Sequence, residues 1–264
     1  MIGLVKNNDV ASLREILENE DPLQILTSVR DEFKNIPLMI AVLFVHKQMV
    51  EFILSVCSSI LELCLEDSDV LGRSPLLLSL TRESLSITKL LIDRGADVDR
   101  IDDSDKSALH LIAQGSQNDD MKIRLLQLFP GVDSNQQDNS GNTPLMLVKE
   151  SKSVVAEELL ERGANPNIPN RSGNTALHIK PALTRILLSH GADPNIQDSM
   201  GNTPLHICRD LDVMRELLER GADPDIQNMD GDTPLHFYSL RPYQQLLLRF
   251  GANPNNEGRL PQLL

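Results

Sequence analysis

Apolar residues along the chain fall into short blocks with helical spacing, separated by polar, Gly-containing segments. In one block, Val155, Leu159 and Leu160 recur at intervals that place them on one face of a helix. The block at 214–218 repeats this arrangement with Met and two Leu residues. The pattern predicts many short amphipathic helices rather than a few long ones.

A recurring motif precedes the first apolar block of each unit, with Thr or Ser followed by Pro or Ala and then Leu. A Thr hydroxyl caps free N–H groups at a helix start, and Pro at the first helical position loses no hydrogen bond. Clear copies occupy 141–145 (GNTPL), 173–178 (GNTALH), 201–206 (GNTPLH) and 231–236 (GDTPLH), and weaker ones occupy 34–38, 72–76 and 105–110. Each copy predicts the start of a helix.

A second motif, Gly-Ala-Asx with a further Asx, predicts where the following helix ends, because Gly in the left-handed conformation closes a helix C-terminus. Its copies lie at 95–99, 163–167, 191–195, 221–225 and 251–255, with a degenerate one at 131–133. The polar turn before the next start predicts an extended hairpin finger. Each unit is therefore helix, helix, finger, and only stacking buries its apolar faces.

Together the motifs T-P-L-H and L-L…G-A-D-x-N, at a period of about 33 residues, resemble the ankyrin repeat. The resemblance is strong from Gly141 to Asn255 and looser before Gly72. It implies an all-α fold, an ankyrin-repeat solenoid of helix-turn-helix units with β-hairpin fingers, about eight units including caps, in a single domain over 1–264. The expected units are an N-terminal cap (1–33), repeats at 34–71, 72–104, 105–140, 141–172, 173–200, 201–230 and 231–257, and a C-terminal cap or truncated repeat at 258–264.

The later repeats are short although both motifs are intact, so the missing residues must come from the end of the first helix and the loop after it. Pro181 limits one first helix to little more than a turn and predicts a notch on the concave side. Pro242 is expected to open the second helix of the last complete unit. At the other end, 9–17 is expected to be a helix of the cap. Segment 57–65 is apolar where a Gly-Ala-Asp turn is expected, which favours a divergent, buried cap over a binding site.

Composition and charge narrow the function classes. The chain is 41% hydrophobic but only 3% aromatic, which suits the thin aliphatic layers of a repeat protein. Lys and Arg number 25 against 38 Asp and Glu, for a net charge of −13. This balance disfavours nucleic acid and anionic membranes as partners. A basic segment on a protein partner is allowed, although ordinary solubility charge is the simpler explanation.

Cys57, Cys64 and Cys208 are odd in number and lack metal-ligand spacing with the six His residues, so neither a disulfide framework nor a zinc site is indicated. No basic leader and no apolar run of membrane length is present in the sequence. We therefore expect a monomer located in the cytoplasm or nucleus.

Four His residues recur at the fourth place of the start motif, at positions 110, 178, 206 and 236. The ankyrin resemblance implies that each imidazole bonds to the cap Thr or Ser and to nearby backbone rather than performing chemistry. The sequence contains no Gly-rich phosphate loop, Gly-x-Ser-x-Gly elbow or His-Glu-x-x-His pair. We accordingly predict no catalytic residue, no cofactor and no metal site, so the chain is not expected to be an enzyme.

The resemblance implies a protein-interaction module, acting as an adaptor, inhibitor or scaffold, which binds a partner protein along the concave surface of fingertips and first helices. Met200 and Met229 stand out as apolar tips, which fits an interface centre or a pair packed on each other. The candidate partner-binding residues are Arg73, Lys106, Asn142, Arg171, Asn174, Met200, Asn202, Met229, Asp230 and Asp232. Within this class the chain resembles the acidic inhibitors of nuclear factor kappa-B, which mask a basic segment of their partner. The alternative is a substrate receptor of a ubiquitin ligase, or the regulatory domain of a larger enzyme whose other domains are absent from this chain.

Overall fold

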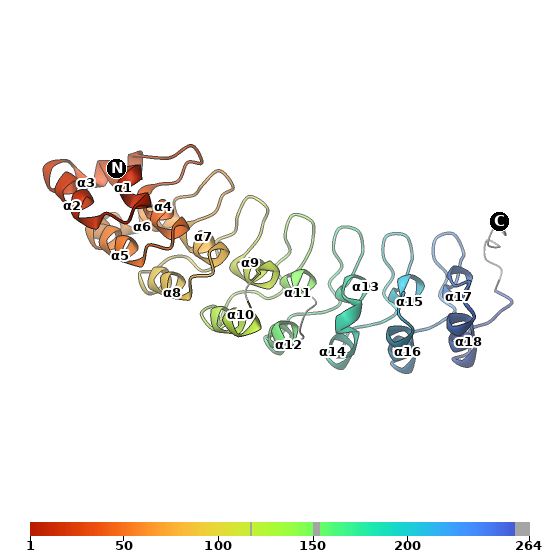
Figure 1. Ribbon diagram of the computed structural model, residues 1–264. Coiled ribbons are helices and arrows are strands. Elements are labelled where there is room, and N and C mark those ends of the chain that lie inside the picture. The colour runs from red at the N-terminus through yellow and green to blue at the C-terminus, as the bar shows by residue number, and fades with distance from the viewer. Residues whose placement is uncertain (117, 150–153, 257–264) are drawn as a thin grey trace. The chain divides into compact units, whose positions relative to one another are not determined.

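The computed structural model describes residues 1–116, 118–149 and 154–256, and their helices divide between two compact units, Met1–Asp133 and Ser134–Leu264. Within each unit, first helices lie next to the finger loops and second helices lie on the far side (Figure 1). This is the predicted all-α solenoid of stacked helix pairs. The expected limits of the individual repeats, and a single domain over 1–264, stay predictions.

The first unit begins with a cap of three helices, α1 (Ile2–Lys6), α2 (Val10–Asn19) and α3 (Pro22–Ser28). The cap helix predicted at 9–17 is confirmed as α2, which Asp9 caps by accepting the backbone N–H of Ser12 at 3.0 Å. The remaining elements are α4 (Pro37–Leu43), α5 (Lys47–Val56), η1 (Cys57–Ser59), α6 (Leu61–Glu66), α7 (Pro75–Thr81), α8 (Leu85–Asp93), α9 (Ala108–Gln114) and α10 (Asp119–Leu126).

Apolar packing holds the first unit together. The first helices α4, α7 and α9 are each seven residues long, and α4 packs between α1 and α7. Every residue of α4 from Pro37 to Val42 is buried. The polar pair between α7 and α8 is satisfied, since the Ser79 and Thr88 hydroxyls lie 2.8 Å apart. Burying one Leu, Ile or Val side chain of these helices contributes about 1.5–3 kcal/mol to the free energy of folding.

The second unit is built from shorter first helices. Those described, α11 (Pro144–Leu147), α13 (Ala176–Ile179), α15 (Pro204–Ile207) and α17 (Pro234–Phe237), have four residues each. Their partners are α12 (Val154–Glu161), α14 (Thr184–Ser189) after the 3₁₀ turn η2 (Pro181–Leu183), α16 (Leu211–Glu219) and α18 (Arg241–Arg249). Helix α13 ends before Pro181, and Pro242 lies in the first turn of α18, so the two helix limits predicted from proline are confirmed.

The fingers are closed by turn hydrogen bonds, and no described residue lies in a β-strand. In one finger, Asp198 N–H donates to the Asn202 carbonyl at 2.8 Å and Gly201 N–H donates to the Asp198 carbonyl at 2.9 Å. Neighbouring fingers share a single backbone bond, such as Met229 N–H to the Met200 carbonyl at 3.0 Å. Because one bond does not make a ladder, the fingers are hairpin-like turns rather than paired strands.

Asparagine side chains bridge consecutive repeats of the second unit. The Asn195 amide donates to the Gly221 carbonyl at 3.0 Å, and its oxygen accepts the Asp223 N–H at 2.8 Å. Asn167 and Asn135 make the same two kinds of bond one and two repeats earlier, respectively. The residue that the motif places at the end of each Gly-Ala-Asx-Pro-Asx turn therefore fastens one repeat to the next.

Candidate protein-binding surface

The repeated His side chains are committed to the fold. In α15, the Nδ1 atom of His206 accepts the Thr203 backbone N–H at 3.0 Å and lies 2.9 Å from the Thr203 hydroxyl. Its Nε2 donates to the Asp232 carbonyl of the next finger at 3.1 Å. Burial lowers the pKa of His178 and His206, which favours the neutral imidazole that this arrangement needs. The predicted structural role of these residues is confirmed.

Two methionines form the apolar part of the fingertips in the second unit. Met200 and Met229 occupy consecutive tips joined by the backbone bond between them. Their exposed fractions, 62% and 78%, leave most of both side chains in contact with solvent. Arg171, on the preceding tip, is also exposed, and Ser199 N–H joins that finger to the next through the Ser172 carbonyl at 3.0 Å. The three tips thus form one continuous surface.

Several of the other candidate residues take part in bonds within the chain. Asn142 and Asn202 each accept an amide N–H from the following finger, at 3.0 Å in both cases, and Asn202 is buried. Asn174 and Asp232 are half-buried at the finger bases. Asp230 is exposed beside Met229.

In the first unit, Arg73 and Lys106 lie at the finger bases rather than free in solvent. The Arg73 guanidinium donates to the Asp69 carboxylate at 2.6 and 2.9 Å, and the Lys106 ammonium donates to the Gln114 side chain at 2.9 Å. The structure therefore brings together Arg171, Met200, Met229 and Asp230 as exposed tip residues, and it places Arg73 and Lys106 in the other unit.

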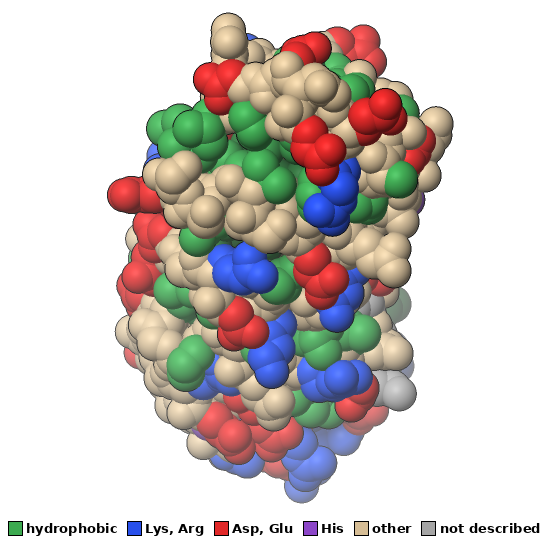
Figure 2. All heavy atoms as spheres, turned by 90° about the vertical axis from the view of Figure 1, so that its left-hand side faces the viewer, with side chains coloured by type: hydrophobic (Ala, Val, Ile, Leu, Met, Phe, Trp, Pro, Cys, Tyr) green, Lys and Arg blue, Asp and Glu red, His purple; other side chains and the backbone are tan. Residues whose placement is uncertain are grey.

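The fingers of the first unit carry exposed apolar residues that are not among the candidate partner-binding residues. Phe33 and Leu71 are 55% and 52% exposed, and Val70 and Ile101 are exposed as well. Val70 N–H bonds to the Phe33 carbonyl at 3.1 Å, so these are neighbouring tips. Val70 and Leu71 are apolar at finger positions where most copies hold a small or polar residue. Figure 2, which looks onto the N-terminal end, shows hydrophobic side chains gathered toward its upper left.

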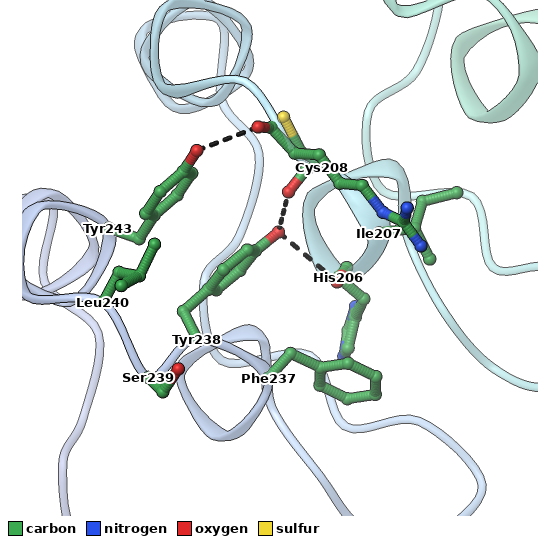
Figure 3. Close-up of a pocket in the computed structure, with 9 residues that line it drawn as sticks. His206, Ile207, Cys208, Phe237, Tyr238, Ser239, Leu240 and Tyr243 are labelled. Carbon is green, nitrogen blue, oxygen red and sulfur yellow. Dashed lines mark hydrogen bonds between the residues drawn. The ribbon is translucent and has the colours of Figure 1, made fainter.

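A pocket of about 500 Å³ opens beside the first helices of the last two repeats (Figure 3). The chain after α15 and after α17 runs extended at Cys208 and Tyr238, and the space that a second helical turn would fill stays open. Apolar side chains that are exposed at its rim are Ile207, Phe237 and Leu240. The other lining residues are His206, Cys208, Arg209, Tyr238, Ser239 and Tyr243.

Two tyrosines give this pocket a fixed wall. The Tyr238 hydroxyl lies 2.6 Å from the Cys208 carbonyl and 2.7 Å from the Leu205 carbonyl, and the Tyr243 hydroxyl donates to the Arg209 carbonyl at 2.8 Å. Their rings stack with centroids 5.1 Å apart. Burial raises the pKa of Tyr238, so its hydroxyl keeps the proton that it donates. The wall is therefore held in place before any ligand arrives.

The notch predicted at Pro181 is small. The cavity beside this residue measures about 40 Å³, because the turn η2 fills the space after α13. The larger opening lies in the next two repeats, where no such turn follows the first helix. Since α13, α15 and α17 are equally short, the extended loops at Cys208 and Tyr238 decide where the pocket forms.

The helices and the ionisable side chains of the described residues bear on other functions. None of their helices is long and apolar enough to cross a membrane. Over the same residues, no three His, Cys, Asp or Glu side chains are grouped so that they could hold a metal ion.

Comparison with known proteins gives a consistent result. Family models of ankyrin repeats match residues 2–102 and 109–179, 172–199 and 187–237. Human rabankyrin-5 is 35% identical over 128 residues, which are 44% of this chain and 11% of that protein. Inversin of Canis lupus familiaris is 32% identical over 116 residues, covering 43% of this chain and 10% of inversin. The chain thus spans about a tenth of the length of these relatives.

A solved structure has a similar fold. The ankyrin repeat domain of Bcl-3, described as a unique member of the IkappaB protein family, superposes with a TM-score of 0.70 at 26% sequence identity. The match covers 82% of this chain and 100% of that domain.

Proposed function

This chain belongs to the ankyrin-repeat family, whose fold is a protein-interaction module, and on that premise we propose that it binds a partner protein through the tips and first helices of its last repeats. The observation that carries the proposal is the juxtaposition of Met200 and Met229 on bonded neighbouring tips, in the same repeats as the pocket. We call this set of residues, together with Ile207, Phe237 and the pocket lining, the C-terminal binding surface.

The C-terminal binding surface has the composition of an interface centre. Met adapts its shape to a partner, and aromatic and Arg side chains are enriched where binding energy is concentrated. Phe237 and Tyr243 supply the aromatic surface, Arg209 is an exposed cation of the pocket lining, and Arg171 is exposed on the preceding fingertip. A partner segment that inserts one apolar side chain into the pocket would bury these groups together.

The acidic net charge adds a preference without fixing the contacts. At −13, the chain attracts basic segments over a distance and speeds their association at low salt. Cys57, Cys64 and Cys208 are free thiols, which supports a reducing compartment, the cytoplasm or nucleus, as the place of binding. Adaptor, inhibitor and scaffold roles all use such a surface.

Affinity purification with quantitative mass spectrometry tests the proposal. The Met200→Asp/Met229→Asp double variant is expected to reduce capture of the main partner at least about tenfold, since two hot-spot side chains together contribute more than about 1.4 kcal/mol. Leu248→Asp is the matched control, because Leu248 is 46% exposed on the second helix α18 and away from the fingers. Equal recovery with the double variant, at an unchanged melting temperature, would exclude this surface.

A further inference from the structure

Two of the three cysteines lie side by side in the first unit. Cys57 stands in η1 and Cys64 in α6, and their Sγ atoms are 3.2 Å apart, within range of an S–H···S hydrogen bond. Both side chains are almost completely buried, and neither cysteine forms a disulfide. The third, Cys208, belongs to the second unit, where its Sγ lies 3.1 Å from the Asp210 carbonyl. The spacing of Cys57 and Cys64 therefore sets them apart as a pair.

We propose that Cys57 and Cys64 form a reversible intramolecular disulfide when the protein meets a peroxide. The sulfur atoms need to approach by roughly 1 Å to reach the bonded distance of about 2.05 Å. The segment that must move is short, since only six residues separate the two cysteines: the rest of η1, Ile60 and the first three residues of α6. It also stands where the regular repeats have a Gly-Ala-Asx turn, so no repeat motif constrains it.

A small oxidant can reach the pair through a thin cover. Ser58, Ser59, Glu62 and Leu63 are exposed, and this turn lines an open hollow of about 1050 Å³. Helix α6 has six residues and no side-chain hydrogen bond at its N-cap. Short, weakly capped surface elements open locally at low free-energy cost, which exposes what lies beneath them.

The pair is also arranged for the chemistry. The hydrogen bond between the two thiols lowers the pKa of Cys64, although burial opposes this, so the first thiolate forms at Cys64. That thiolate attacks one oxygen of hydrogen peroxide and the O–O bond breaks. Hydroxide departs as the leaving group, and Cys64 becomes a sulfenic acid. Cys57, after losing its proton, attacks this sulfur and displaces the second hydroxide. Two thiols and one peroxide thus give one disulfide and two waters.

The disulfide would fix the base of a neighbouring finger. Helix α6 ends at Glu66, whose carboxylate accepts the Asp97 N–H at 3.1 Å, and the next residue, Asp67, forms an ion pair with Arg30 at 2.7 Å. A covalent link behind α6 removes conformational freedom from the unfolded chain and holds these contacts together. Oxidation is therefore expected to stabilise the first unit.

The test treats the full chain with a small excess of hydrogen peroxide, then alkylates remaining thiols and maps peptides by mass spectrometry. We expect a linked Cys57–Cys64 peptide, lighter by two hydrogen atoms. Cys208 should still react with the alkylating agent when the sample is unfolded without a reducing agent. Dithiothreitol should reverse the change. The melting temperature should rise by about 5 °C on oxidation and return on reduction.

Serine variants separate this outcome from general oxidation. Cys208→Ser should behave as the unmodified chain, whereas Cys57→Ser should lose the linked peptide and carry higher oxidation states on Cys64. Equal alkylation of all three cysteines after peroxide treatment would overturn the proposal. Disulfides found only between molecules, or involving Cys208, would overturn it as well.

Discussion

The two units stack the same kind of repeat by different means. In the first, seven-residue helices bury aliphatic side chains along their whole length. In the second, the described first helices have four residues, and Asn side chains carry hydrogen bonds from repeat to repeat. One motif position shows the difference, since Leu78 is completely buried four residues after its cap whereas Ile207, four residues after its own, is 39% exposed.

The two units differ in how much apolar surface the end of the first helix exposes. When bridging hydrogen bonds fasten the repeats, the end of the first helix is released from the core, and its apolar side chains face solvent around a pocket. When apolar packing fastens the repeats, the side chain at this position, as at Leu78, is buried in the core. The units should therefore respond differently to matched substitutions.

The largest expected difference comes from truncating that shared position. Leu78→Ala removes a fully buried side chain and should lower the free energy of unfolding by about 3 kcal/mol. Ile207→Ala should cost under about 1 kcal/mol, because its side chain is already partly in water. Urea unfolding followed by circular dichroism measures both, and equal losses would contradict the contrast between the units.

Next in size is the close approach of neighbouring fingers. Gly201 has φ of +79°, and a Cβ there would lie 2.7 Å from the Met229 backbone nitrogen, so Gly201→Ala should cost about 2–3 kcal/mol. Gly221 has a similar φ of +91° and open space around it. Gly221→Ala should therefore cost only about 1 kcal/mol. Similar destabilisation in thermal unfolding would show that finger contact adds nothing.

A smaller effect is expected from the amide bridges. Asn195→Ala deletes one donor and one acceptor between repeats and should cost about 1–2 kcal/mol. Asn195→Asp keeps the acceptor, as the natural Asp225 does toward Asn253 N–H, and should cost about half as much. If neither variant changes the denaturation midpoint, hydrogen bonds do not hold the second unit together.

The smallest effect is a pH dependence of the second unit. Burial holds the pKa of His178 and His206 below the ordinary value of 6.5, so the unfolded chain binds more protons below that pH. The stabilising contribution of the neutral imidazoles is complete above about pH 6.5 and is lost as the pH falls toward the folded-state pKa. The His178→Gln/His206→Gln variant should show a shallower loss in melting temperature between about pH 7 and pH 5. An unchanged slope would contradict this assignment.

Much of the fold follows from local chemistry in the sequence. The Thr and Pro starts, the His caps and the helix limits near Pro181 and Pro242 are confirmed, because each depends on backbone groups within a few residues. The pocket was not predictable in the same way, since Tyr238 bonds to carbonyls of the preceding repeat.

The apolar tips of the first unit and the thiol pair were missed for a related reason. Leu71 lies in a finger that keeps the turn hydrogen bonds of the regular copies, so the motif does not single it out. The contact of Cys57 with Cys64 depends on a helix, α6, that occupies the place of an expected turn. Sequence motifs indicate the local structure of one repeat, whereas these features depend on contacts between side chains of different elements.

Hydrogen exchange of the chain with and without its captured partner tests the central claim most directly. The account predicts slower exchange on binding at 199–201, 207–209, 229–231 and 237–240, with α16 and the last turn of α18, residues 246–249, unchanged. Protection confined to the second helices, or to the fingers that carry Phe33 and Leu71, would contradict it.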